Sequence, residues 1–228
     1  MAQQMLLGLA PQWTPGFDNF VPGDNAELLS RLRGLADPHV FDRVYLWGAE
    51  GCGKSHLLDA TARSATVRRP VMIVDGLTAP ADLTARPGTL VVIDDVQHLS
   101  ADAQIGVFRL FNAAPLIGLA LLIAGPCPPR ELALREDLRT RIGQCLVQSL
   151  HPLSDEDKAA TLQRHAAQRG MKLDAGVLQY LLRHGRRDLP SLMATLDALD
   201  RTCLEQKRAP TLPLLRELMQ THLPLDTR

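Results

Sequence analysis

The chain has 228 residues, of which 46% are apolar and only 4% are aromatic, so its core must rest mainly on Leu, Ala, Val and Ile. Its 25 basic and 25 acidic residues give a formal net charge of zero, which excludes a general electrostatic attraction to DNA or to anionic membranes. The four cysteines form no C-x-x-C pair and no zinc-type spacing with histidine, and no apolar stretch approaches the roughly 20 residues of a membrane span. These features predict a cytoplasmic protein with reduced thiols and no membrane contact.

The first 16 residues hold Gln, Pro and Gly around one apolar cluster, and we expect them to form a flexible tail. The cluster lies within the stretch Gln4-Met5-Leu6-Leu7-Gly8-Leu9. Taken alone, this stretch is a slightly apolar tail or a piece of a strand.

The stretch from Gly48 to Ser55 fits the phosphate-binding pattern G-x-x-x-x-G-K-[ST], the Walker A or P-loop motif. Its glycines let backbone N–H groups close around phosphates, Lys54 reaches the terminal phosphates, and the Ser55 hydroxyl ligates Mg²⁺. We expect a helix to begin near Lys54, so that a bound anion meets free N–H groups and the positive end of the helix dipole. The residues expected to contact the nucleotide are Gly48, Gly51, Cys52, Gly53, Lys54, Ser55 and His56. For His56, a role in packing is the alternative.

A second half of the site follows at Leu90-Val91-Val92-Ile93-Asp94-Asp95, an apolar run that ends in two carboxylates. This pattern is typical of a buried strand with the Mg²⁺-binding acid at its carboxyl end. We therefore expect Asp94 to hold Mg²⁺ together with Ser55, and Asp95 to polarise an attacking water. Either half alone could be a glycine-rich turn or a core strand, whereas both in this order indicate nucleotide binding.

Five short apolar runs alternate with helix-like segments, which predicts an α/β fold with a five-stranded parallel sheet and helices on both faces. The expected strands are Val44–Trp47, Val71–Asp75, Leu90–Asp94, Leu119–Ala124 and Cys145–Leu150.

After Pro152 the pattern becomes entirely helical. Ser154, followed by three acidic residues, is a typical N-cap, and Gly170 is a typical stop. The expected helices begin after Ser154 and run to Arg169, then span Ala175–Arg183, Ser191–Lys207 and Leu212–Thr221. The sequence thus predicts a tail (1–16), a nucleotide-binding α/β domain (17–151) and a small helical lid domain (152–228).

Together these stretches resemble the DnaA-like AAA+ family, and within it the shorter DnaA regulatory inactivators known as Hda. The resemblance is carried by Phe17-Asp18-Asn19-Phe20-Val21-Pro22-Gly23-Asp24-Asn25, Tyr45-Leu46-Trp47, Gly53-Lys54-Ser55-His56-Leu57-Leu58, Ile93-Asp94-Asp95, Pro128-Pro129-Arg130, Arg139-Thr140-Arg141 and Leu153-Ser154-Asp155-Glu156-Asp157-Lys158. It implies an AAA+ P-loop fold that binds ADP or ATP with Mg²⁺, the segment Phe17–Asn25 packing near the base. The initiators of the family carry a further DNA-reading domain, and we expect none here because the lid is followed directly by Arg228.

The resemblance also assigns two arginines. It makes Arg141 an arginine finger, the residue that enters the nucleotide site of a neighbouring AAA+ subunit and stabilises the charge of the transferred phosphoryl group. It makes Arg187 the sensor-2 residue, which contacts the nucleotide of its own chain and couples the lid to it. From pattern alone, each is one of several surface arginines.

One region departs from the family pattern. The relatives usually carry a hydroxyl and a carboxylate at the end of the fourth strand, whereas Ala124-Gly125-Pro126-Cys127 supplies neither. We therefore expect weak or no ATP hydrolysis by this chain itself.

The resemblance gives the tail a partner as well. Gln4, Leu7 and Leu9 match the Q-x-x-L-x-L peptide that docks on the sliding clamp, the β subunit of DNA polymerase III. The implied function is negative regulation of replication initiation, in which the clamp-tethered chain promotes hydrolysis of DnaA-bound ATP and meets DNA only through the loaded clamp. A nucleotide-dependent homodimer is left open. The alternatives are a self-contained AAA+ ATPase of helicase-loader or initiator type, and a P-loop small-molecule kinase.

Overall fold

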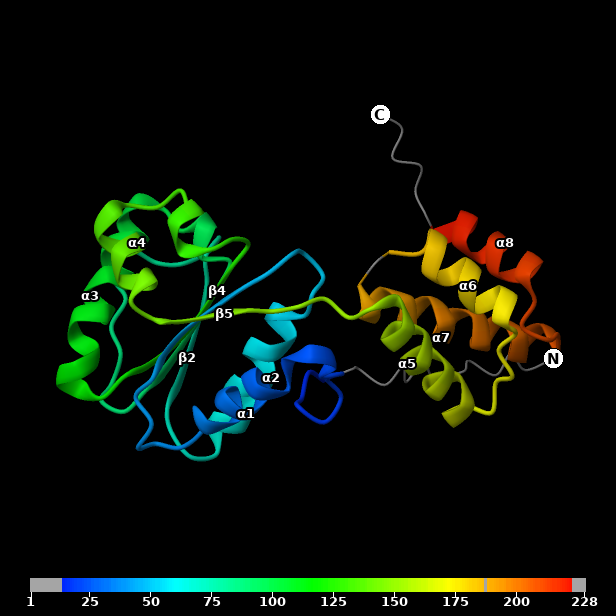
Figure 1. Cartoon of the computed structure of the whole chain (residues 1–228), viewed down its shortest axis with the longest axis horizontal. Helices are drawn as coiled ribbons and strands as arrows, with labels where there is room; N and C mark the ends of the chain where they lie inside the picture. Colours follow the sequence, from blue (N-terminus) through cyan, green and yellow to red (C-terminus); the bar gives the residue numbers. More distant parts are fainter. Residues whose placement is uncertain (1–13, 187, 223–228) are drawn as a thin grey trace, which may run out of the picture.

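A computed structural model describes residues 14–186 and 188–222 of the chain (Figure 1). It contains a five-stranded parallel sheet in the order β2-β3-β4-β1-β5, which confirms the predicted architecture. The strands are β1 (Arg43–Trp47), β2 (Val71–Asp75), β3 (Leu90–Asp94), β4 (Ala120–Gly125) and β5 (Leu146–Ser149). Each strand lies within one residue of its expected bounds, and β5 is shorter than expected by one residue at each end.

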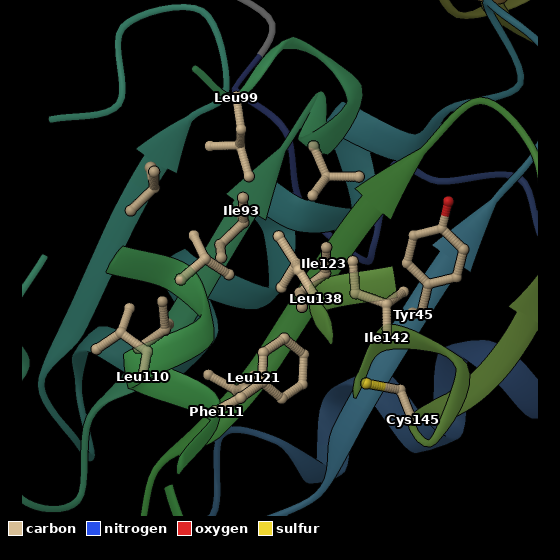
Figure 2. Close-up of a cluster of buried hydrophobic side chains, with 14 of the residues drawn as sticks. Tyr45, Ile93, Leu99, Leu110, Phe111, Leu121, Ile123, Leu138, Ile142 and Cys145 are labelled. Carbon is tan, nitrogen blue, oxygen red and sulfur yellow. The ribbon is translucent and has the colours of Figure 1, made fainter. Parts of the chain in front are cut away.

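Helices cover both faces of the sheet because its strands send alternate side chains to opposite sides. One face, which bears Val44, Leu46 and Leu122, packs against α1 and α2. The other, which bears Ile93 and Ile123, packs against α3 and α4 (Figure 2). The bounds are η1 (Gly23–Asn25), α1 (Ala26–Gly34), α2 (Lys54–Thr66), η2 (Val96–His98), α3 (Ala101–Ile117), η3 (Pro129–Glu131) and α4 (Glu136–Gly143).

Beyond β5 the chain crosses to a separate helical unit, which lies beside the sheet domain along the long axis (Figure 1). Its helices are α5 (Asp155–Gln168), α6 (Ala175–His184), α7 (Leu189–Gln206) and α8 (Leu212–His222). They enclose a core of their own, with Leu162, Leu181 and Leu215 fully buried. The predicted helices are present, although the domain boundaries at 16/17 and 151/152 stay predictions.

The local signals at the helix ends act as expected. The Ser154 hydroxyl accepts a hydrogen bond from the N–H of Asp157 at 3.0 Å, and Gly170 takes a φ of 72°. Helix α7 begins two residues before its expected start because the Asp188 carboxylate accepts a hydrogen bond from the N–H of Ser191 at 2.9 Å. Pro190 then occupies the first turn, where its missing N–H costs nothing. No helix in the described ranges is long and apolar enough to span a membrane.

Candidate nucleotide site

The phosphate loop lies between β1 and α2, as the sequence predicts. Gly51 and Gly53 have φ values of 74° and 103°, which residues with a Cβ rarely adopt. A Cβ on Gly48 would lie only 2.7 Å from the carbonyl oxygen of Leu150, so this position also requires glycine. Helix α2 has no side-chain cap at its N-terminus. Its first N–H groups therefore lie at the loop, in the arrangement that binds phosphate.

The side chains of the loop are suited to binding an anion. The Lys54 ammonium donates to the carbonyl oxygens of Gly48 and Ala49, at 2.8 and 3.0 Å, so it is held at the loop by two neutral groups. Ser55 is exposed at the start of α2. Burial raises the pKa of the Cys52 thiol, which keeps it uncharged beside bound phosphates. A thiolate at this position would repel them.

The two carboxylates at the end of β3, on its last residue Asp94 and on Asp95, lie in different backbone environments. Asp94 Oδ1 accepts a hydrogen bond from the N–H of Asp95 at 2.9 Å. Asp95 has a φ of 48°, unusual for a non-glycine residue, and its Oδ1 accepts from the Gln97 side chain at 2.9 Å. Asp95 lines the same opening as Lys54 and Ser55. Backbone strain of this kind is characteristic of functional sites, which supports a role for Asp95.

Gly76 contributes to this region, and the sequence analysis did not include it. The N–H of Gly76 donates to the carbonyl oxygen of Asp94 at 3.0 Å. A Cβ on Gly76 would collide with the carbonyl oxygen of Asp95. The only signal in the sequence is the Asp75-Gly76 pair at the end of a strand, which also marks many ordinary turns.

We expect Gly76→Ala to lower the free energy of unfolding by about 1–3 kcal/mol, because the backbone of Asp95 must move to accept the new methyl group. Urea denaturation measures this loss. Gly34→Ala is the matched control, since a Cβ there meets nothing within 4 Å and Gly34 has no positive φ. Equal stability of the two variants would show that the contact between Gly76 and Asp95 imposes no constraint.

A cavity of about 490 Å³ extends from the phosphate loop and is large enough for a nucleotide. Its walls come from the loop, from the segment Asn19–Val21 and from the beginning of the lid. Phe20 lies directly over the loop, since a Cβ on Gly53 would come within 2.9 Å of its ring. Phe17, by contrast, packs under the guanidinium of Arg33, whose Cζ is 5.1 Å from the ring centre. Of the two aromatic residues expected near the base, only Phe20 lines the cavity.

His56 forms part of the same wall. Its Nε2 lies 2.9 Å from the carbonyl oxygen of Gly16, and its ring centre lies 5.5 Å from that of Phe20. These contacts tie the N-terminal segment to α2. His56 thus shapes the cavity through packing, and its direct contact with the nucleotide stays a prediction.

The start of α7 reaches the phosphate loop from the lid. A Cβ on Gly51 would lie 3.0 Å from Cβ of Asp188. Arg186 and Asp188 line the opening shared with Lys54 and Asp95, and they form an ion pair of 3.3 Å. Burial alone would raise the pKa of Asp188, but the hydrogen bonds from Ser191 and the charge of Arg186 outweigh it and hold the pKa below its usual value. Asp188 was not among the predicted site residues.

Two parts of the predicted site lie outside the described residues. They are the tail residues Gln4, Leu7 and Leu9, and the sensor-2 candidate Arg187. Arg186 and Asp188, on either side of Arg187, both line the opening at the phosphate loop.

The end of β4 lacks a polar side chain, as the sequence indicates. Ala124 and Gly125 are buried, and a Cβ on Gly125 would collide with the hydroxyl of Tyr45. That hydroxyl donates to the carbonyl oxygen of Cys127 at 2.7 Å. Burial raises the pKa of Tyr45, with a further contribution from Cys127, so the hydroxyl stays a neutral donor. Tyr45 therefore fixes this loop by a backbone contact.

Arg141 lies in the last turn of α4, on the sheet face opposite to α2. It lines neither cavity at the phosphate loop. Its neighbours are neutralised: Arg139 pairs with Glu136 at 2.7 Å, and Arg135 pairs with Asp137 at 2.9 Å. Arg141 makes no ion pair within the part of the chain that the structure describes. A charged guanidinium is thus presented away from the chain's own nucleotide cavity.

Comparison with known proteins matches the lid to a family and the fold of the whole chain to several solved structures. The model of a family described as "Hda, lid domain" matches residues 155–219. Domain III of the replication initiation protein DnaA from Thermotoga maritima superimposes with a TM-score of 0.71 at 20% identity, covering 90% of this chain and 95% of that chain. A replication initiator DnaA bound to AMPPCP and single-stranded DNA gives 0.68 at 18% identity, covering 90% and 68%. A RuvB variant from Thermotoga maritima gives 0.68 at 16% identity, covering 91% and 72%.

Proposed function

We propose that this chain, whose lid matches the family described as "Hda, lid domain" and whose fold resembles DnaA domain III, is a negative regulator of replication initiation that promotes hydrolysis of the ATP bound to DnaA. In this proposal the chain's own nucleotide sets the conformation of the α/β domain and the lid, the tail docks on the sliding clamp, and Arg141 completes the catalytic site of DnaA. The observation that carries the proposal is the placement of Arg141: it has no ion-pair partner among the described residues and is remote from the chain's own phosphate loop.

The chain's own site is suited to ADP or ATP with Mg²⁺. The phosphates would lie on the N–H groups from Gly51 to Ser55, and Lys54 would move from the Gly48 and Ala49 carbonyls to them. Ser55 and Asp94 would hold Mg²⁺, which neutralises phosphate charge when bound. The lid reaches this site through Asp188, and we propose that Arg187 contacts the nucleotide there. Lid position would then depend on the nucleotide, which makes a nucleotide-dependent homodimer part of the proposal.

Arg141 supplies what hydrolysis in DnaA needs. As the terminal phosphoryl group leaves, negative charge spreads over its oxygens, and a guanidinium supplied by a second molecule stabilises it. Such fingers contribute about 10³–10⁵ in rate, which corresponds to roughly 4–7 kcal/mol of barrier. In the chain's own site, Ala124-Gly125-Pro126-Cys127 offers no side chain to orient water, so we propose that its own hydrolysis is weak.

The tail would provide the tether. Gln4, Leu7 and Leu9 would bind the clamp with a Kd on the order of 1 μM. The residues between Leu9 and Gly16, whose carbonyl oxygen contacts His56, would span about 15 Å as a flexible chain. This length places the α/β domain and the lid at an effective concentration on the order of millimolar near the clamp. A weak contact with DnaA then suffices.

A pull-down on immobilised, DNA-loaded clamp tests the tether. The full chain should be retained, and a chain lacking the first nine residues should be lost while binding ADP with unchanged affinity. Gln4→Ala should also weaken clamp binding, whereas Gln3→Ala, at the neighbouring glutamine, should leave it intact. Equal retention of the full and truncated chains would refute the tether.

A self-contained ATPase is the second candidate, favoured by the complete phosphate loop with Asp94 and Asp95. It predicts substantial ATP turnover by the purified chain alone, and loss of this turnover in Asp95→Asn. Turnover that requires DnaA and the clamp would exclude this candidate.

A further inference from the structure

We infer that Asn112 and Phe108 are positioning residues for Arg141, which hold its guanidinium at the surface without neutralising its charge; this inference rests on the proposed function of Arg141. Arg141 Nη2 donates to Asn112 Oδ1 at 3.0 Å. The guanidinium also lies over the ring of Phe108, with Cζ 5.8 Å from its centre. A neutral amide and an aromatic face thus stand where Arg135 and Arg139 have carboxylates.

The contrast within α4 supports this assignment. Arg135, the N-cap of α4, and Arg139 each pair with a carboxylate of that helix, and the hydrogen bonds that Arg135 donates to Asp137 raise the pKa of Arg135 above its usual value. Arg141, a half-turn from Arg139, is bonded instead through an uncharged side chain of α3. Its second polar contact, to the amide oxygen of Gln144 at 3.5 Å, is also neutral. The positive charge of Arg141 therefore remains available to a phosphate.

The two residues are held by the core. Phe111 precedes Asn112 and Ile142 follows Arg141, and both Phe111 and Ile142 are buried in the cluster between α3, α4 and the sheet (Figure 2). Each functional side chain is thus adjacent to a packed neighbour, which fixes its backbone. Arg141 gives one N–H to Asn112 at good geometry, and most of its five donors remain for a ligand.

Two substitutions of Asn112 distinguish loss of the hydrogen bond that positions Arg141 from neutralisation of the Arg141 charge. Asn112→Asp keeps the shape but gives Arg141 a charged partner, whose hydrogen bond is roughly twice as strong. We expect the maximal rate of DnaA-bound ATP hydrolysis to fall about 10- to 100-fold, with the half-saturating concentration unchanged within about threefold. Asn112→Ala removes only the hydrogen bond that positions Arg141 and should lower the maximal rate about 3- to 10-fold. Arg109→Gln is the charge-matched control on the same helix and should keep the wild-type maximal rate.

Arg141→Ala is measured alongside, so that the two hypotheses can fail separately. An inactive Arg141→Ala with a fully active Asn112→Asp would overturn the positioning role alone. A fully active Arg141→Ala would refute the finger. In that case, NMR of the Arg141 Nη2–H protons still tests the hydrogen bond to Asn112: their exchange should be at least about tenfold faster in Asn112→Ala, and equal exchange would overturn the positioning role. Thermal unfolding confirms that each variant is folded.

Discussion

Arg141→Ala should reduce the hydrolysis of DnaA-bound ATP about 10³-fold or more, in the presence of DNA-loaded clamp, while leaving clamp binding and ADP affinity unchanged. The physical reason is the loss of the Arg141 guanidinium. This group has no ion-pair partner among the described residues and lies on the face away from the chain's own cavity. A single-turnover assay with radiolabelled ATP on DnaA measures this rate directly.

Arg139→Ala is the matched control for this prediction. Arg139 lies two residues earlier on the same helix, and its charge is already used by Glu136 at 2.7 Å. Exposed pairs of this kind contribute little, so the variant should hydrolyse DnaA-bound ATP at close to the wild-type rate. If Arg139→Ala were as defective as Arg141→Ala, the effect would belong to the helix and not to one guanidinium.

Lys54→Ala should weaken binding of ADP to the chain itself about 10- to 100-fold, because one charged donor to the phosphates is removed. Isothermal titration calorimetry with Mg-ADP measures the loss. The variant should remain folded, since among the described residues Lys54 bonds only to two loop carbonyls. The promotion of DnaA-bound ATP hydrolysis should fall in parallel at low ADP concentration and recover as ADP is raised.

Lys172→Ala, at an exposed lysine of the lid, provides the comparison and should bind ADP normally. If Lys54→Ala bound ADP as tightly as the wild type, the loop would not be a phosphate site. Recovery at high ADP would show that the bound nucleotide acts by setting the conformation of this chain. A direct role of Lys54 in the chemistry at DnaA would not be restored by ADP.

The sequence predicts most of the sheet domain because buried parallel strands appear as continuous apolar runs. The P-loop glycines were predictable for a similar reason, since few other residues adopt the φ values of Gly51 and Gly53. Helix starts at Lys54 and Asp155 follow from the phosphate-loop motif and from the Ser154 cap.

The contacts between distant segments could not be predicted in this way. Asn112 is 29 residues from Arg141, and nothing in its local pattern indicates that it holds the guanidinium. Likewise, the approach of Gly76 to Asp95 and of Asp188 to Gly51 depends on how two elements pack. Phe17 and Phe20 are equivalent in the sequence, and only the fold separates the residue at the cavity from the residue under Arg33.

The structure of this chain assembled with DNA-loaded clamp and DnaA, carrying a non-hydrolysable ATP analogue, is the most direct test of the central claim. We predict the Arg141 guanidinium within about 3 Å of a terminal phosphate oxygen on DnaA, with Asn112 still hydrogen-bonded to it. A guanidinium that faces solvent, remote from the nucleotide of DnaA, would contradict the account.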